Sequence, residues 1–474
     1  MKKRTKLKIF ILISLALAMA APAQAFGQPA PLIHAQTHVL IEAQTGRILS
    51  ENEAHRRMFP AATTMILTAI LAYEHIGMDD IIVAGSEVNM LPPASARNGH
   101  EVGEAISGQN LLRGMLIGAG NDTSNIVAIE VIRRLEGDWD IDFAAAQQLF
   151  ANLMNQRAQE LGALDSHFMN PHGFHHDSHF TTAYDMAQIA RHALGIDVIM
   201  QIVGAGSFSG PMAGYATVPE GALQLSRNWN SANELIQPGP NFYPYAIGLR
   251  TGFTNQAGYS LVAAARREGV SLISVTFNSP VVGGQPTRWQ DNISLFEYGF
   301  ANYAYRVFFE SHSPVGSMDI YNPALDDYGH LEFFATQGGS LFLSEQEMGR
   351  LVRDVDILPE FLLDVYDDDT GEYTRMFVAP IEEGQVLGTI SYELDGEIIF
   401  STALYAARGV TERTTVRDIE YFMNRLRQIF FTSDAIPFWI AGVSVLILLA
   451  VLIILARNSI RRKRRNNRYK LRRF

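Results

Sequence analysis

Apolar and polar positions follow clear periods through the first two thirds of the chain. Residues 38–50 read as two short strands on either side of a turn at Gln44–Gly46. Apolar residues at helical spacing run from Thr63 to His75, with Pro60 just before them. The same spacing predicts further helices at 108–118, 121–135, 143–161 and 181–194.

Apolar runs resume near the end of this region. Ser260–Glu268 and Val270–Asn278 lie on either side of Gly269 and predict a hairpin, and Arg288–Tyr303 predicts a closing helix. Central helices with strands from both ends indicate one α+β domain over residues 26–305.

The pattern changes from Val307 to Gly409. Short β-branched segments are separated by Gly, Asp and Asn, which predicts a small β-rich domain over residues 306–410. An amphipathic pattern over 411–430 predicts a helix within a juxtamembrane segment, 411–434.

The N-terminal end has the pattern of a secretory signal. Basic residues occupy much of 2–8, an apolar run follows from Ile9 to Ala20, and an A-x-A site ends at Ala25. We expect residues 1–25 to be a signal peptide cut before Phe26. An uncleaved anchor is the alternative, but the apolar run is short for a membrane span.

The C-terminal end has a longer apolar run. Ile436 to Ala456 is long enough to cross a bilayer, and we expect a transmembrane helix at 435–456. Residues 457–474 carry eight Arg, two Lys and no acidic residue. Because basic flanks stay on the cytoplasmic side, the expected topology is a single-pass cell-membrane protein with its main body outside the cytoplasm.

The amino-acid composition excludes several kinds of reaction and partner for the part of the chain outside the cytoplasm. The chain has no cysteine, which excludes a lipoprotein anchor, thiol catalysis and zinc–thiolate sites. All 49 acidic residues lie between Phe26 and Asp434, together with 23 Arg and no Lys. Such an acidic surface repels nucleic acid, so no nucleic-acid partner is expected. No lysine is available outside the cytoplasm for any reaction.

Several segments, in order along the chain, resemble one enzyme family. They are Thr45-Gly-Arg-Ile-Leu49, Phe59-Pro-Ala-Ala-Thr-Thr-Met-Ile-Leu-Thr-Ala69, Leu164–Gly173, His179–Asp185 and Gly248-Leu-Arg-Thr-Gly-Phe-Thr254. This sequence resembles the serine D-alanyl-D-alanine carboxypeptidases of peptidase family S11, the low-molecular-mass penicillin-binding proteins of the peptidoglycan cell wall. The resemblance implies a DD-peptidase/β-lactamase-like α+β fold, an antiparallel sheet with a helical cluster.

The resemblance also implies a catalytic apparatus. The family motif P-A-S-x-T-K supplies a serine nucleophile and a lysine base one helical turn later. Here Ala62 stands at the serine and Met65 at the lysine, while the S-x-N motif reads Ala119, Gly120 and Asn121. A methyl group cannot attack a carbonyl, and a thioether cannot accept a proton at neutral pH. No catalytic set is therefore intact.

Neighbouring hydroxyls offer no clear replacement. Thr63 and Thr64 adjoin the nucleophile position, but successive helical residues point about 100° apart. The positions three residues after them are Ile66 and Leu67, which cannot act as bases.

A binding apparatus remains. The family's K-T-G strand, which binds the substrate carboxylate, is represented by Arg250, Thr251 and Gly252, followed by Phe253, whose backbone belongs to the family's oxyanion hole. With Asn121, these are the expected substrate-binding residues, and Arg250 retains a positive charge with a different geometry from lysine.

Two functions follow from these residues. The first is an inactive homologue that binds peptidoglycan stem peptides ending in D-Ala-D-Ala or regulates wall-synthesis proteins. The second is a still active carboxypeptidase that removes the terminal D-Ala by another route. Loss of both Ser and Lys favours the first, although sequence drift could also leave an empty pocket. No cofactor is expected.

A cluster of histidines has the density of a metal site. It comprises His172, His175, His176 and His179, with Asp177 nearby. The resemblance accounts for His172 and His179 as structural positions, so no metal site is predicted.

Overall fold

The computed structural model describes residues 29–214, 216–367, 371–430 and 436–470. The predicted signal peptide, 1–25, lies outside these residues. The chain forms two compact units: one extends to Ala304 and includes Phe342–Met348, and the other comprises Tyr305–Leu341 and the chain from Gly349 onward.

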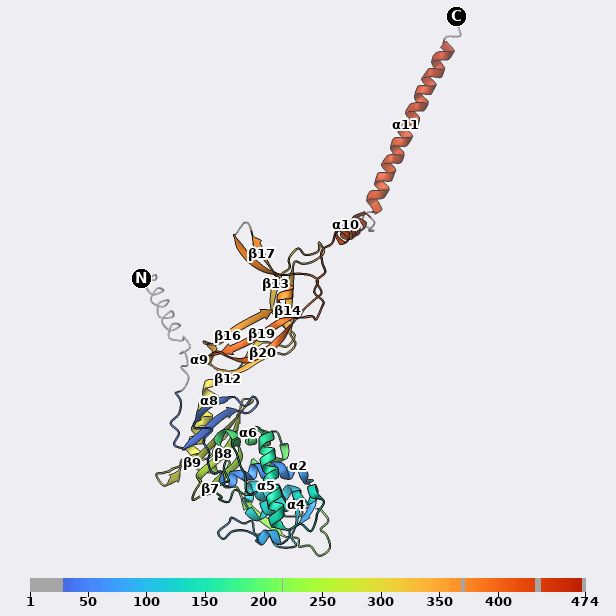
Figure 1. The fold of residues 1–474 in the computed structure, drawn as a ribbon. Coiled ribbons are helices and arrows are strands. Elements are labelled where there is room, and N and C mark those ends of the chain that lie inside the picture. Colours follow the sequence, from blue (N-terminus) through green and yellow to red (C-terminus); the bar gives the residue numbers. More distant parts are fainter. Residues whose placement is uncertain (1–28, 215, 368–370, 431–435, 471–474) are drawn as a thin grey trace, which may run out of the picture. The chain divides into compact units, whose positions relative to one another are not determined.

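The first unit is built on a five-stranded antiparallel sheet with the strand order β2-β1-β9-β8-β7 (Figure 1). The strands are β1 (Thr37–Glu42), β2 (Ile48–Asn52), β7 (Ala246–Thr254), β8 (Gly258–Arg267) and β9 (Val270–Ser279). The predicted N-terminal strands and the hairpin around Gly269 are all present. The N-terminal strand β1 lies beside β9, with pairs from Thr37↔Phe277 to Glu42↔Leu272.

Alternation along the strands gives the sheet two apolar faces. On one face α8 (Arg288–Asn302) packs so closely that a Cβ on Gly299 would lie 2.6 Å from Leu272 and 3.1 Å from Leu40. The opposite face presents Val39 and Val275 to the main core, where helices pack over it. The helices of this core include α2 (Met65–His75), α4 (Asn121–Glu136), α5 (Phe143–Glu160) and α6 (Ala183–Leu194).

Side-chain caps mark the starts of α5 and α6. Asp142 caps α5 by accepting from the N–H of Ala145, and Thr182 caps α6 by accepting from Asp185. The predicted helix at 108–118 is divided into α3 (Gly108–Arg113) and a π-helical turn, Gly114–Gly118. Helix α7 (Asp197–Val203) was not predicted, because seven residues show too little periodicity.

Short elements complete this unit. They are the 3₁₀ turns Ala61–Thr64, Ser86–Asn89 and Glu234–Ile236, and the strands β3 (Ile81–Val83), β4 (Ala105–Ser107), β5 (Ser207–Pro211), β6 (Ser226–Asn230), β10 (Val281–Val282) and β11 (Gln285–Pro286).

The second unit is β-rich, as predicted. Its main sheet has the order β13-β14-β20-β19-β16, and β17 (Leu362–Asp367) pairs with β18 (Glu372–Phe377). Its buried core includes Phe333, Phe377 and Leu404. Its other elements are β13 (Pro314–Asp319), β14 (His330–Ala335), β16 (Val352–Ile357), the 3₁₀ turn Pro359–Phe361, β19 (Val386–Leu394) and β20 (Glu397–Ala406). Strands β12 (Tyr303–Phe309) and β15 (Gly339–Ser344) have residues in both units, and α9 (Glu345–Met348) belongs to the first.

Two helices end the described chain. Helix α10 (Thr415–Phe430) falls within the predicted amphipathic segment, and α11 spans Ile436–Lys470. Within α11, Trp439–Arg462 is long and apolar enough to cross a membrane, and its most apolar 18 residues have a mean hydropathy of 2.9. This stretch overlaps the predicted span.

Candidate functional site

The structure brings the predicted site residues together from three distant segments. They line a cleft of about 630 Å³ in the first unit. The members predicted from sequence are Ala62, Ala119, Asn121, Arg250, Thr251, Gly252 and Phe253. Met65 is the exception, since it is fully buried and does not line the cleft.

A tight turn presents Ala62. The 3₁₀ turn Ala61–Thr64 precedes α2, and Ala61 has a φ of 50°, in the left-handed region. The Thr63 hydroxyl donates to the carbonyl of Pro60 at 2.7 Å, and the Thr64 hydroxyl bonds to His179 Nε2 at 3.0 Å. Both threonines are fully buried, so neither hydroxyl faces the cleft as a replacement nucleophile.

The second segment is the junction between the π-helical turn and α4. Ala119 has a φ of 64°, a conformation in which a Cβ is strained. Asn121 begins α4, and its backbone N–H donates to the carbonyl of Ala96 at 2.9 Å. This bond joins Asn121 to the loop that forms one wall of the cleft, including Ser95 and Ala96.

Strand β7 supplies the charged part of the cleft. The strand is irregular just before Arg250. Its register shifts between Ala246 and Gly248, and Leu249 has a φ of 84°. Arg250 is only 3% exposed, and its Nη2 donates to Met65 Sδ at 3.8 Å. No carboxylate pairs with Arg250 within the described residues, and its Nε has no hydrogen-bond partner there. Burial, with the Arg288 charge nearby, lowers the pKa of Arg250 to about 10, so it stays charged at neutral pH.

A second arginine, Arg288, also lines the cleft, and the sequence reasoning missed it. Its Nη1 donates to the carbonyl oxygens of Gly252 at 3.3 Å and Ser260 at 3.4 Å, and its guanidinium lies over the rings of Tyr259 and Trp289. Burial lowers its pKa to about 10. One signal could have revealed it: Arg288 is the first residue of α8, where the helix dipole disfavours a cation.

Comparison with known proteins identifies the family. Residues 24–281 match the family described as D-alanyl-D-alanine carboxypeptidase, peptidase S11, which is more than half of the chain. The chain belongs to this family. Residues 340–412 also match the C-terminal domain of penicillin-binding protein 5.

Relatives from several bacteria match over most of their own length. The D-alanyl-D-alanine carboxypeptidase DacF of Bacillus subtilis is 25% identical over 383 residues, covering 78% of this chain and 85% of DacF. DacB2 of Mycobacterium tuberculosis is 30% identical over 280 residues, covering 58% of this chain and 84% of DacB2.

Solved structures confirm the predicted fold class. Penicillin binding protein 5 from Haemophilus influenzae superposes with a TM-score of 0.58 at 24% identity, covering 81% of this chain and 100% of that one. The carboxypeptidase DacD from Francisella tularensis gives a TM-score of 0.59 at 22% identity, covering 84% and 98%.

The histidines near the cleft of this S11 family member make bonds to their surroundings. Burial lowers the pKa of His172 and of His179 to about 3, so both are neutral at pH 7. His179 Nδ1 accepts from the N–H of Met169, which leaves the proton on Nε2 for the bond to Thr64. His172 Nδ1 accepts from the N–H of Phe174. His172 lines the cleft, which the sequence did not indicate.

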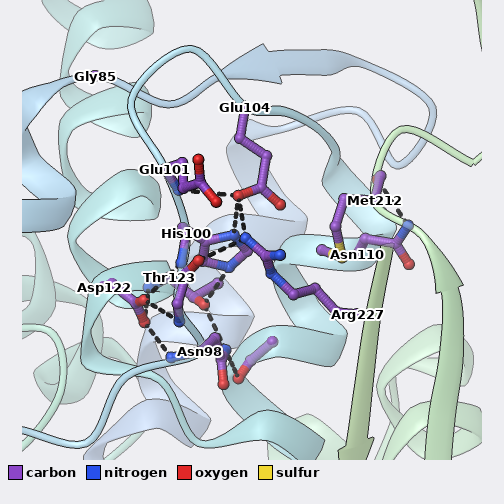
Figure 2. Close-up of polar contacts among 12 residues, drawn as sticks. Gly85, Asn98, His100, Glu101, Glu104, Asn110, Asp122, Thr123, Met212 and Arg227 are labelled. Carbon is purple, nitrogen blue, oxygen red and sulfur yellow. Dashed lines mark hydrogen bonds and ion pairs between the residues drawn. The ribbon is translucent and has the colours of Figure 1, made fainter. Parts of the chain in front are cut away.

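A buried polar network supports the cleft wall. The Asp122 carboxylate accepts from the backbone N–H groups of Asn98, Gly99 and His100 at 2.9–3.1 Å (Figure 2). This ties the wall loop to the start of α4, next to Asn121.

The same network contains paired charges. Glu104 Oε2 lies 3.2 Å from His100 Nδ1 and 2.7 Å from Arg227 Nη2, and His100 Nε2 lies 2.9 Å from Thr123 Oγ1. We call His100, Glu104, Asp122, Thr123 and Arg227 the polar latch. Its members come from the wall loop, α4 and β6, so their pairing is a tertiary feature.

Proposed function

We propose that this protein is an inactive member of the S11 family that binds peptidoglycan stem peptides ending in D-Ala-D-Ala. Ala62 and Met65 stand where the family motif has its nucleophile and base. By analogy with other serine hydrolases, loss of the nucleophile alone removes roughly 10⁶ of rate. Binding without turnover suits a role in sensing stem peptides or in regulating wall-synthesis proteins.

The observation that carries this proposal is the buried guanidinium of Arg250. It lines the cleft, is 3% exposed and has no carboxylate partner within the described chain. A buried charge without a partner is costly, and a ligand carboxylate would supply the partner. Thr251 and Asn121, in the same cleft, offer further polar groups for the peptide.

Backbone strain supports a retained site over sequence drift. Ala61, Ala119 and Leu249 have φ values of 50°, 64° and 84°, and each lies in or next to a motif segment of the cleft. A non-glycine residue in this region costs on the order of 1–3 kcal/mol and tends to mark functional sites. If the cleft had no remaining function, substitutions could have removed the backbone strain at these positions.

The test is calorimetric titration of the full-length protein in detergent with a peptide ending in D-Ala-D-Ala. Replacing Arg250 by Ala removes a charged hydrogen bond worth about 1.5–3 kcal/mol, so affinity should fall about 10- to 150-fold. Arg56→Ala, in an exposed ion pair, is the control and should bind as the wild type does. Equal binding by wild type and Arg250→Ala, or no binding by the wild type at millimolar peptide, would refute the proposal.

A second measurement tests inactivity separately. β-Lactams acylate the serine of this family, and Ala62 offers no oxygen. Intact-protein mass spectrometry after penicillin treatment should show no added mass, and Ala62→Ser provides the comparison for the pocket's access to the drug. A stoichiometric adduct on the wild type that survives denaturation would support an active enzyme instead.

We also propose a single-pass topology and a division of the chain at 26–305, 306–410, 411–434, 435–456 and 457–474. The apolar stretch Trp439–Arg462 and the basic residues that follow it support this topology. Protease added to protoplasts should digest the body and spare a tag placed after Phe474. Protection of the body would mean the reverse orientation.

A further inference from the structure

The contact between Met65 and Arg250 joins two of the exchanged motif positions. Met65 Sδ accepts from Arg250 Nη2 at 3.8 Å, and both side chains are almost completely buried. Met65 does not line the cleft, so its influence on a ligand must pass through Arg250.

The charge at position 250 constrains the residue at position 65. Arg250 has no carboxylate partner in the described residues, and the Arg288 charge already lowers its pKa. A lysine ammonium at position 65 would add another buried positive charge at contact distance. Arginine cannot relieve this repulsion by losing its proton, and its rigid fork cannot move away as a lysine stem can. A thioether is uncharged, polarizable and able to accept a weak hydrogen bond.

We propose that Met65 and Arg250 are a coupled pair, in which the thioether at position 65 allows a guanidinium to be buried at position 250. Met65 is then a positioning residue for the anion-binding group of the cleft. This inference rests on the proposed binding function for its ligand, the carboxylate end of a stem peptide. It also means that a lysine at position 65 should be tolerated less well with arginine at position 250 than with lysine there.

A thermodynamic cycle on the full-length protein in detergent tests the coupling without any ligand. The variants are Met65→Lys, Arg250→Lys, their combination, and Met65→Leu as an uncharged control of similar volume. Tryptophan fluorescence follows the first unit, since Trp139, Trp229 and Trp289 lie in it. Met65→Lys should lower the Tm by on the order of 5–10 °C in the presence of Arg250, and by much less with Arg250→Lys. Met65→Leu should lower it only slightly.

Each outcome of the cycle is decisive. An equal fall in Tm with either residue at position 250 would overturn the coupling. If Met65→Lys does not fold, recovery of folded protein on adding Arg250→Lys supports the proposal, and failure of the combination contradicts it.

Peptide titration then separates this inference from the proposed function. Met65→Lys should lose about 10-fold or more in affinity for a D-Ala-D-Ala peptide, whereas the control Arg56→Ala should bind as the wild type does. If the wild type binds no peptide while the Tm cycle shows coupling, the binding function fails and the pairing stands.

Discussion

Two arginines in the first unit, the partly buried Arg227 and the buried Arg250, have opposite surroundings. Arg227, in the polar latch, lies 2.7 Å from the Glu104 carboxylate, which is also 3.2 Å from His100. Arg250, in the cleft, has a methionine sulfur and no carboxylate within the described residues. The chain therefore contains the counter-ion for one guanidinium and omits it for the other.

We therefore assign the polar latch a structural role and, under the proposed function, assign Arg250 a role in ligand binding. The latch pairs the Arg227 guanidinium with the Glu104 carboxylate and holds the wall beside Asn121, so its loss should affect folding first. Under the proposed function, the desolvated guanidinium of Arg250 binds the ligand carboxylate, so its loss should affect binding first. The same substitution, arginine to methionine, can be made at both sites.

Arg227→Met should have the largest effect on stability. It removes the arginine partner of the buried Glu104 carboxylate and leaves only His100 beside it, which costs about 1–3 kcal/mol of the free energy of unfolding. Urea denaturation followed by tryptophan fluorescence measures this loss. Peptide affinity at low temperature, where the variant is folded, should stay within about 3-fold of the wild type. A stable variant that has lost binding would contradict the division of roles.

Arg250→Met should show the reverse. Removing an unpaired buried charge should leave the free energy of unfolding unchanged or raise it by about 1–2 kcal/mol. Peptide affinity should fall about 10- to 150-fold. A loss of stability comparable to that of Arg227→Met would mean that Arg250 is also structural.

Acid should act on the latch and not on the cleft. Burial alone would raise the pKa of Glu104, but hydrogen bonds from His100 and Glu101 and the Arg227 charge outweigh it, so the net pKa lies below 4.5. Stability from this shift is therefore present above about pH 4.5 and is lost as pH falls through the lowered pKa. Glu104→Gln should be less stable than the wild type at pH 7, and the difference should narrow towards pH 3. In Arg250→Met, the free energy of unfolding should fall with decreasing pH as it does in the wild type.

The smallest predicted effect concerns backbone strain at the cleft. Ala119 has a φ of 64°, so Ala119→Gly should stabilise the protein by up to about 1 kcal/mol. The matched control is Ala128→Gly, within α4, which should destabilise by about 1 kcal/mol. Both are measured by thermal unfolding, and a loss at position 119 would show that its conformation is not strained.

Helices and strands could be predicted where an apolar pattern extended over many residues. The hairpin around Gly269 and helix α5 lie within a few residues of their predicted bounds. The motif positions Ala62, Asn121 and Arg250 could be placed at one site because a family resemblance linked them. Periodicity alone would not have brought them together.

Side-chain pairing was beyond reach of the sequence. His100, Glu104 and Arg227 look like ordinary surface residues in the printed chain, and only the tertiary fold brings them into one buried network. The Met65–Arg250 contact joins residues 185 positions apart. Arg288 was missed for a related reason. Its bonds to the carbonyl groups of Gly252 and Ser260 depend on how the start of α8 packs against β7 and β8.

The pairing of β1 with β9 has a consequence for how the protein is made. Strand β1 is an interior strand of the sheet, yet its partner β9 ends at Ser279. During synthesis, β1 therefore has only its β2 edge covered until more than two hundred further residues have followed. The sheet is complete before the apolar stretch from Trp439 is synthesised, so under the proposed topology the first unit can fold before its membrane anchor is made.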